Sequence, residues 1–332
     1  MKKYLNNPDA VVDEMIEGFL AIHGNKFVQL PTSRVLVRKE VPIKGKVAVV
    51  TGGGSGHKPA FIGYLGDGMV DAVAVGDIFS SPSAQQIYDA IKATDSGAGV
   101  LCILGNYSGD VMNFEMAIEM ATEDSIAVEQ VIVNDDVGSA PKDKRDNRRG
   151  VVGEVVAWKI AGAQTKQGAS LSEVKETVER AVFNTRSFGV AHAPCTLPTS
   201  DEPTFTLKEG EMEIGVGHHG EPGVKKMPMK SANETTSMLM DKILEDLPFT
   251  RGDEVAVIIN GLGATSLLEL HIIYRKVHAI LQHSGISVHR TYIGEFFTSL
   301  EMAGFSITLT KLDPGLKQLL DVPANAALFT QV

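Results

Sequence analysis

The chain alternates short runs of β-branched apolar residues with longer amphipathic segments, and this alternation constrains its fold more than any other feature. The amphipathic segments predict helices at Asp9–Phe19, Ser83–Ala93, Asn113–Met120, Leu171–Asn184 and Ser266–His283. The apolar runs predict strands at Val47–Val50, Val100–Leu104, Val128–Val133 and Val255–Ile259. Strands that alternate with helices are typical of βα units, so we expect an α/β fold around a mostly parallel sheet.

The length of 332 residues predicts two domains, because a typical domain has about 150 residues. Between Arg186 and Asp201, glycine, proline and hydroxyl residues interrupt both periodicities, which favours a boundary there. We therefore expect an N-terminal α/β domain at residues 1–188, with glycine-rich strand-to-helix loops, and a C-terminal α/β domain at residues 189–332. Alternating apolar residues between Thr204 and Gly217 predict short strands early in the second domain.

The charge balance excludes some classes of partner. Lys and Arg number 31 against 41 Asp and Glu, which gives a net charge of −10. Nucleic acid and anionic membranes are not expected as the main partner, because the summed field does not attract them. The charge-dense segment Pro141–Arg149 is interpreted as a solvated surface loop, with a docking surface as the alternative.

The cysteines and the hydropathy of the chain indicate in which cellular compartment it is expected. Cys102 and Cys195 lack CxxC spacing, so a disulfide scaffold and a zinc ribbon are both excluded. No run of about 18 apolar residues occurs, and the N-terminal lysines are not followed by an apolar stretch, so we expect neither a membrane span nor a signal peptide. A reducing, cytoplasmic location is the resulting expectation.

A glycine cluster, Thr51–Pro59, directly follows the first predicted strand. Such a cluster lets backbone N–H groups approach an oxygen-rich ligand. The sequence Gly56-His57-Lys58 is not the Gly-Lys-Ser/Thr of a P-loop, and the dinucleotide fingerprint lacks its acidic partner. A tight structural turn is the alternative, but His57 at the carboxyl end of a strand favours a ligand site.

A second loop repeats this arrangement after the strand Val100–Leu104, where Gly105 is followed by Asn-Tyr-Ser-Gly-Asp110. Parallel strands open on the same edge of the sheet, so Asp110 and His57 are expected to face one pocket. A carboxylate and an imidazole there are typical of an acid/base pair. Asp110 as a helix N-cap is the alternative, and the two roles can coexist.

The third candidate is the segment Gly215–Gly223, which contains His218 and His219. Neighbouring side chains on an extended strand point to opposite faces, so a shared metal ion is not expected. A histidine flanked by glycines is sterically open, which suits a nucleophile. A turn with incidental histidines is the alternative.

Two other features are interpreted as structural. Trp158 is expected to be a core residue. Asn260–Gly263 is expected to be a structural turn, with an interface contact as the alternative.

Taken together, the three loops resemble the dihydroxyacetone-binding subunit family of dihydroxyacetone kinases, which includes a coactivator paralogue without kinase activity. The resemblance covers essentially the whole chain and rests on long motifs. These motifs are Gly52–His57, Gly105–Phe114, Val133–Val137, Arg148–Gly150, Ala193–Pro198 and Gly217–Gly223.

The resemblance implies roles for single residues. His219, which precedes Gly-Glu-Pro-Gly, corresponds to the histidine that binds the ketone carbonyl covalently as a hemiaminal. His57 and Asp110 correspond to the general acid/base residues. Gly54 and Ser55 correspond to backbone ligand contacts, and Gly56 and Gly105 complete the expected substrate site.

The resemblance implies a substrate-binding kinase subunit whose phosphoryl group comes from a partner that carries the nucleotide and Mg²⁺, with no cofactor or metal on this chain. It also implies a homodimer. Two positions depart from the family pattern: Gly105 stands where a lysine is usual, and Lys58 where a glutamate is usual. The alternatives are therefore a ketose sensor that acts as coactivator of a transcription regulator, and an erythrulose kinase subunit.

Overall fold

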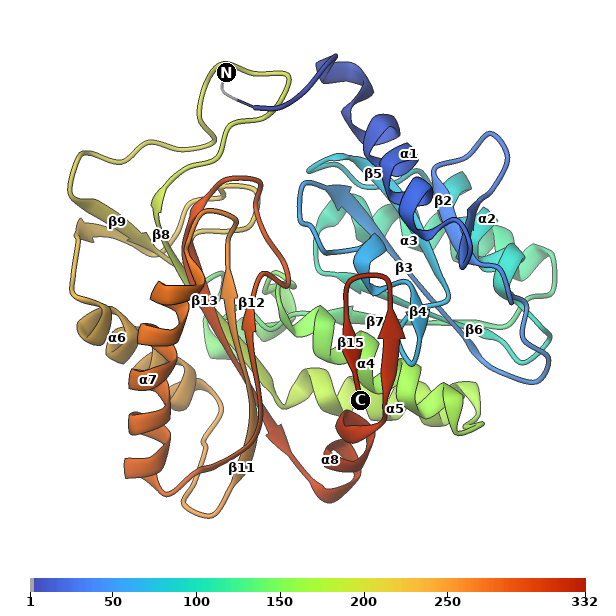
Figure 1. Ribbon diagram of the computed structural model, residues 1–332. Coiled ribbons are helices and arrows are strands. Elements are labelled where there is room, and N and C mark those ends of the chain that lie inside the picture. The colour runs from blue at the N-terminus through green and yellow to red at the C-terminus, as the bar shows by residue number, and fades with distance from the viewer. Residues whose placement is uncertain (1–2) are drawn as a thin grey trace.

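The computed structural model describes residues 3–332, which form two α/β units built on two six-stranded sheets (Figure 1). In the first sheet the strand order is β1-β2-β5-β3-β6-β7. Strands β5, β3, β6 and β7 are parallel to one another, whereas β1 and β2 are added antiparallel at one edge. The strands are β1 (Phe27–Gln29), β2 (Val35–Arg38), β3 (Ala48–Ser55), β5 (Ala72–Ile78), β6 (Val100–Gly105) and β7 (Val128–Val133). The expected mostly parallel sheet is confirmed.

Helices cover both faces of this sheet. On one face α2 (Ala84–Thr94) and α3 (Ser108–Glu123) pack against alternate residues of the strands, such as Val50 and Cys102. On the other face α4 (Gly153–Lys166) and α5 (Leu171–Phe183) pack against Val49 and Ile103, and α1 (Val11–His23) joins the same core. Ser83 begins α2 with a capping box to Gln86, as its sequence predicts.

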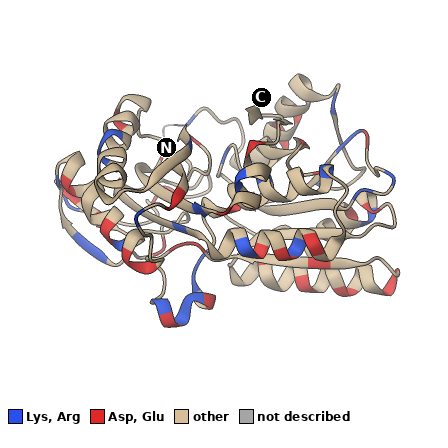
Figure 2. Cartoon of the chain, turned by 90° about the horizontal axis from the view of Figure 1, so that it is seen from below, with Lys and Arg blue, Asp and Glu red and all other residues tan. Residues whose placement is uncertain are grey.

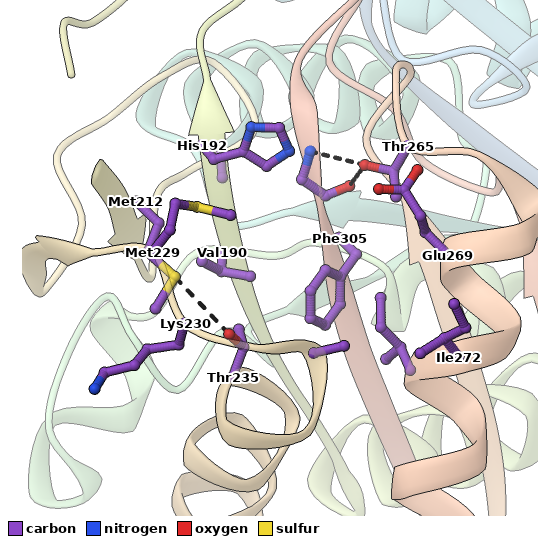
Figure 3. Close-up of a pocket in the computed structure, with 14 residues that line it drawn as sticks. Val190, His192, Met212, Met229, Lys230, Thr235, Thr265, Glu269, Ile272 and Phe305 are labelled. Carbon is purple, nitrogen blue, oxygen red and sulfur yellow. Dashed lines mark hydrogen bonds between the residues drawn. The ribbon is translucent and has the colours of Figure 1, made fainter. Parts of the chain in front are cut away.

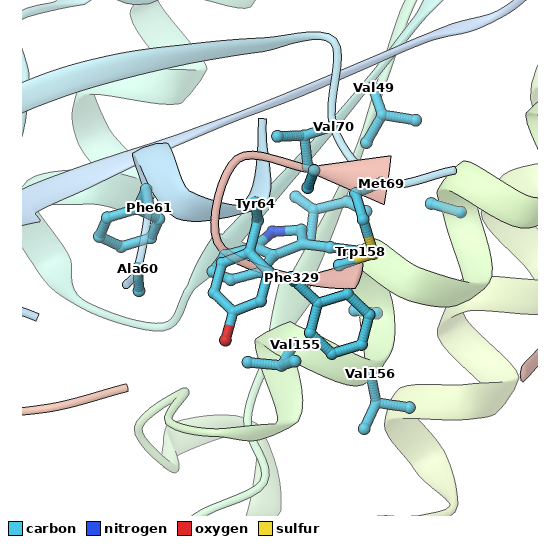
Figure 4. Close-up of a cluster of buried hydrophobic side chains, with 14 of the residues drawn as sticks. Val49, Ala60, Phe61, Tyr64, Met69, Val70, Val155, Val156, Trp158 and Phe329 are labelled. Carbon is cyan, nitrogen blue, oxygen red and sulfur yellow. The ribbon is translucent and has the colours of Figure 1, made fainter. Parts of the chain in front are cut away.

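Helix α4 was not predicted, and its burial explains why. Nearly every residue from Gly153 to Ala163 is buried, so the helix has no polar face and no amphipathic period. It contacts strands of both sheets, which makes it the central helix of the molecule (Figure 1). Trp158 lies fully buried on α4 beside Tyr64 and Phe329 (Figure 4). Its interpretation as a core residue is confirmed.

The second sheet has the order β10-β9-β8-β13-β11-β12 and is antiparallel except for the pair β11–β12. Its strands are β8 (Thr185–Ala193), β9 (Glu211–Ile214), β10 (Lys225–Pro228), β11 (Glu254–Gly261), β12 (Ser287–Gly294) and β13 (Ala303–Leu312). Helices α6 (Ala232–Asp246) and α7 (Leu267–Ser284) cover its outer face (Figure 1). Val257 on β11 faces these helices, whereas Ile258 faces the core shared with the first unit.

The two units are joined along the chain in more than one place. The expected division between residues 188 and 189 falls inside β8, which belongs wholly to the second sheet. After α8 (Pro314–Asp321) the chain returns to the first unit, where β14 (Ala324–Ala326) pairs with β15 (Thr330–Gln331) and β4 (Gly66–Asp67). The expected strands within Thr204–Gly217 are reduced to β9, because residues 205–210 form no ladder.

Charged positions are distributed over helices and loops of both units, and the view of Figure 2 shows no broad basic face. Among the helices described, none is long and apolar enough to cross a bilayer. The segment Lys142–Asn147 is a 3₁₀ turn that is mostly exposed, as a surface loop is expected to be. Arg148 is an exception, because it is buried and its guanidinium binds the Asp246 carboxylate with N–O distances of 2.6 and 2.9 Å.

Candidate functional site

The first two predicted loops lie at the same edge of the first sheet. Strands β3 and β6 are parallel neighbours, with Thr51 paired to Ile103, so the loops after Ser55 and Gly105 open side by side. Helix α3 begins at Ser108, earlier than expected, with Tyr107 as its N-cap. Asp110 therefore lies in the first helical turn, and its interpretation as an N-cap is wrong.

His57 is almost completely buried at this edge. Its Nδ1 lies 2.7 Å from the carbonyl oxygen of Thr298, and its ring stacks on Phe79 with centroids 4.9 Å apart. Burial lowers the pKa of His57 well below its ordinary value, and the neighbouring His219 and His218 lower it further. Burial therefore disfavours the charged form of the ring, and its two contacts fix its orientation.

The loop that contains Thr298 is itself fixed by Asn260, which sequence reasoning treated only as part of a structural turn. The Asn260 carboxamide is fully buried, donates to the carbonyl oxygen of Phe297 and accepts from the backbone N–H groups of Phe296 and Phe297. This network connects β11 of the second unit to the histidine of the first.

His219 lies between β9 and β10, and its side chain reaches across to the first unit. Its Nε2 is 3.0 Å from Nε2 of His57, and its Nδ1 is 2.9 Å from Oε1 of Glu221. The backbone N–H of His219 donates to Oε2 of the same glutamate. The ring is also packed edge-on against Tyr107 and Phe79, with centroids 4.8 and 5.0 Å away.

Glu221 is a site residue that sequence reasoning missed, although its motif was quoted. Burial alone would raise its pKa, but the hydrogen bond from His219 and the charges of His219 and Arg149 lower it to about 2. Gly217 makes room for this arrangement, because a Cβ there would lie 2.0 Å from Oε2 of Glu221 and 2.3 Å from Nη1 of Arg149. Arg149 also donates to the carbonyl oxygen of Gly215, which anchors the loop.

The hydrogen-bond partners determine where the protons of the two histidines lie. The carbonyl oxygen of Thr298 and the carboxylate of Glu221 only accept, so Nδ1 of His57 and Nδ1 of His219 both carry hydrogen. Each neutral ring then has a lone pair on Nε2. Two lone pairs 3.0 Å apart repel one another, and a proton shared between the two Nε2 atoms would remove this repulsion.

Asp110 is a further ionisable group at this site. Burial raises its pKa to about 6, partly offset by a hydrogen bond with Ser81 and by the charge of His219. Its Oδ1 is buried without a hydrogen-bond partner among the residues described. A carboxylate with a pKa near neutrality is a more effective general base than an ordinary aspartate.

The glycine loop supports these side chains. A Cβ on Gly54 would lie 2.6 Å from the backbone nitrogen of Ser80, and Gly56 has a φ of +103° that favours glycine. The hydroxyl of Ser55 donates to the carbonyl oxygen of Gly76, so it also holds the loop in place. A Cβ on Gly105 would lie 2.6 Å from Oε1 of Glu154, a buried acid that sequence reasoning did not identify.

His218 is turned away from its neighbour and does not join the pair. Its ring is buried and stacks on Phe297 with centroids 4.8 Å apart. Burial lowers the pKa of His218 to about 3, helped by the charge of His219. Within residues 3–332, no three His, Cys, Asp or Glu side chains converge as metal ligands do.

A separate apolar pocket lies on the outer face of the second sheet, under α6 and α7 (Figure 3). Val190 and Phe305 form its floor, and His192, Lys230 and Glu269 are its polar side chains. None of the predicted site residues lines it, so it is distinct from the histidine site.

Comparisons with known proteins identify the family of this chain. Residues 17–328 match the model of the Dak1 domain. The dihydroxyacetone-binding subunit DhaK of a PTS-dependent dihydroxyacetone kinase from Listeria innocua is 43% identical over 99% of both chains. An L-erythrulose kinase from Pectobacterium atrosepticum is 40% identical over 99% of this chain, which spans 56% of that protein.

Among solved structures, the dihydroxyacetone kinase operon co-activator DhaQ has a TM-score of 0.90 and 31% identity over 96% of this chain and 98% of that one. The resemblance seen in the sequence motifs is thereby confirmed, and so is the α/β fold. The chain belongs to the Dak1 family.

Proposed function

We propose that this chain is the dihydroxyacetone-binding subunit of a multi-subunit dihydroxyacetone kinase. The observation that carries the proposal is the orientation of His219, whose Nδ1 is held by Glu221 while its Nε2 points to His57. A partner subunit supplies the phosphoryl group from its nucleotide with Mg²⁺. The homodimer implied by the family resemblance is part of the same proposal, and light scattering measures it.

The proton between the two histidines suits the formation of a hemiaminal. The ketone enters by separating the rings, and the Nε2 lone pair of His219 forms a bond to the carbonyl carbon. The C–O π bond breaks as this bond forms, and the oxygen takes the proton that lay between the rings. His57 is left neutral with a free Nε2, and the positive charge on the alkylated ring of His219 lies beside the Glu221 carboxylate.

Covalent attachment compensates for the small size of the substrate, which offers few contacts for ordinary binding. With the carbon fixed on His219, a terminal hydroxyl lies within reach of Asp110 and the free Nε2 of His57. Asp110, with its pKa of about 6, accepts the hydroxyl proton as the oxygen attacks the incoming phosphoryl group. The donor nucleotide is left on the partner without its terminal phosphoryl group. The phosphorylated ketose leaves when its C–N bond to His219 breaks, the carbonyl re-forms and the hydroxyl proton returns to Nε2 of His57.

Reconstitution with the partner encoded beside this chain tests the proposal. The wild-type pair is expected to phosphorylate dihydroxyacetone, whereas Asp110→Asn is expected to form the adduct yet lose about 10²- to 10⁴-fold in turnover. Glu119→Gln, the same kind of change at an exposed acid of the same helix, is the matched control and is expected to retain turnover. Equal turnover by Asp110→Asn would refute the role of this carboxylate.

A coactivator is the second candidate, favoured by the similarity to DhaQ over nearly the whole of both chains. A sensor needs the covalent histidine but no general base, so no partner subunit would support phosphorylation of the ketose. Ketose would instead strengthen binding to a DNA-binding regulator, through its different affinities for the two states of the chain. An erythrulose kinase subunit is the third candidate, supported by the similarity to an L-erythrulose kinase.

A further inference from the structure

Glu154 is a buried acid for which the fold provides no partner. It lies in the first turn of α4, is 1% exposed, and its Oε2 has no hydrogen-bond partner among the residues described. An unpaired buried carboxyl group destabilises a folded protein, so its presence calls for an explanation. Asp135, another buried acid nearby, differs because it accepts from the backbone N–H groups of Val151 and Gly153.

The position of Glu154 connects it to the histidine site. Its Oε1 occupies the space beside Gly105, 2.6 Å from where a Cβ would lie, and ring carbons of Tyr107 lie 3.3 Å from the same point. Tyr107 in turn packs against His219. Burial raises the pKa of Glu154 well above its ordinary value, and the charges of Asp110 and Asp135 raise it further. This environment favours the neutral carboxyl group, which can both donate and accept a hydrogen bond.

Glu154 is not the only unpaired polar group at this place. The hydroxyl of Tyr107 and Oδ1 of Asp110 are also buried and have no hydrogen-bond partner within residues 3–332. Electrostatic interactions couple Glu154 to both residues. Each of the three side chains thus has a buried polar atom without a partner among the residues described, and Tyr107 places them next to a proposed carbonyl-binding histidine. Such a group fits a ligand that carries several hydroxyl groups.

We propose that Glu154 is a specificity-determining residue, whose carboxylic acid hydrogen-bonds a hydroxyl of the ketose attached to His219. The absence of a side chain at Gly105 gives the carboxyl group access to that hydroxyl. The inference rests on the proposed function and specifies its substrate class, a short-chain ketose with hydroxyls on both sides of the carbonyl. A ketone that lacks one of these hydroxyls leaves the acid unpaired, and sites of this kind reject such analogues.

The test compares dihydroxyacetone with hydroxyacetone, which lacks one hydroxyl, by calorimetric titration of the full chain. Wild type is expected to bind dihydroxyacetone at least about tenfold more tightly. Glu154→Leu is expected to reduce the preference for dihydroxyacetone over hydroxyacetone about tenfold, because it weakens the binding of dihydroxyacetone alone. Glu154→Gln is expected to retain part of this preference. Gly105→Ala is also expected to reduce the preference for dihydroxyacetone, because its methyl group displaces the Glu154 carboxyl group.

Thr165→Val is the matched control, because Thr165 is a buried polar residue at the far end of the same helix. It is expected to leave the selectivity unchanged. The inference is overturned if folded Glu154→Leu keeps the wild-type ratio of the two affinities. If the leucine variant does not fold, the same result in Glu154→Gln and Gly105→Ala overturns it. The proposed function stands in either case. If wild type forms no adduct on His219 with either ketone, the proposed function fails, and the inference fails with it.

Discussion

Replacing Asp110 by asparagine is expected to stabilise the ligand-free protein while it removes a reactive group. Burial raises the pKa of Asp110 from its ordinary value of 3.8 to about 6. Each factor of ten in proton affinity corresponds to 1.36 kcal/mol, so ionised Asp110 destabilises the folded state by about 3 kcal/mol. Asparagine has nearly the same shape and no charge, so the variant avoids this penalty.

The sign of the pH dependence follows from the raised pKa. Between pH 4 and 6 the folded state binds more protons at Asp110 than the unfolded state, so wild-type stability falls as the pH rises through this window. The variant lacks this dependence. Urea unfolding at several pH values is therefore expected to show similar stabilities near pH 4 and a difference that grows to about 2–3 kcal/mol above pH 7. A difference that stays constant with pH would refute the account of Asp110.

Three further predictions concern other parts of the molecule. Glu221→Gln removes the negative charge beside His219 and is expected to weaken the dihydroxyacetone adduct about 10- to 100-fold, measured by titration; unchanged affinity would exclude a charge role. Asp246→Ala leaves the guanidiniums of Arg148 and Arg186 buried without their counterion and is expected to cost about 3–5 kcal/mol in urea unfolding, whereas exposed Asp241→Ala has little effect. Titration of the isolated chain with Mg-ATP is expected to show no binding, because no motif for phosphate binding is present; turnover by this chain alone would overturn the subunit assignment.

The sequence was sufficient to predict those elements whose pattern is local. The amphipathic helices α2, α5 and α7 have one buried face, so their periods are visible along the chain. The strands β3 and β6 are buried on both faces and are visible as short continuous apolar runs. Helix α4 has no such period, because both sheets cover it. The predicted surface loop Pro141–Arg149 includes Arg148, which is buried and pairs with Asp246. Asp246 is 98 positions away, so no local pattern could reveal this pairing.

The same limit applies to the site. The common sheet edge predicted for the first two loops is confirmed by the pairing of β3 with β6. The contact between His57 and His219 joins residues 162 positions apart, and Thr298, which fixes the His57 ring, lies in a third segment. Glu221 and Glu154 act through neighbours that only the fold brings together. The residue types and the positions of the loops could therefore be predicted from the sequence. The hydrogen-bond partners of the two histidines and the unpaired buried acids could be found only in the structure.

The central claim is that His219 binds a ketose covalently through Nε2. Carbon NMR of the full chain with dihydroxyacetone labelled at its carbonyl carbon tests this directly. Our account predicts that the bound signal leaves the ketone region for that of a tetrahedral carbon, with coupling to labelled Nε2 of His219, and that His219→Ala abolishes this signal while His218→Ala retains it. A bound ligand whose carbon remains a ketone, or a tetrahedral signal that survives in His219→Ala, would contradict the account.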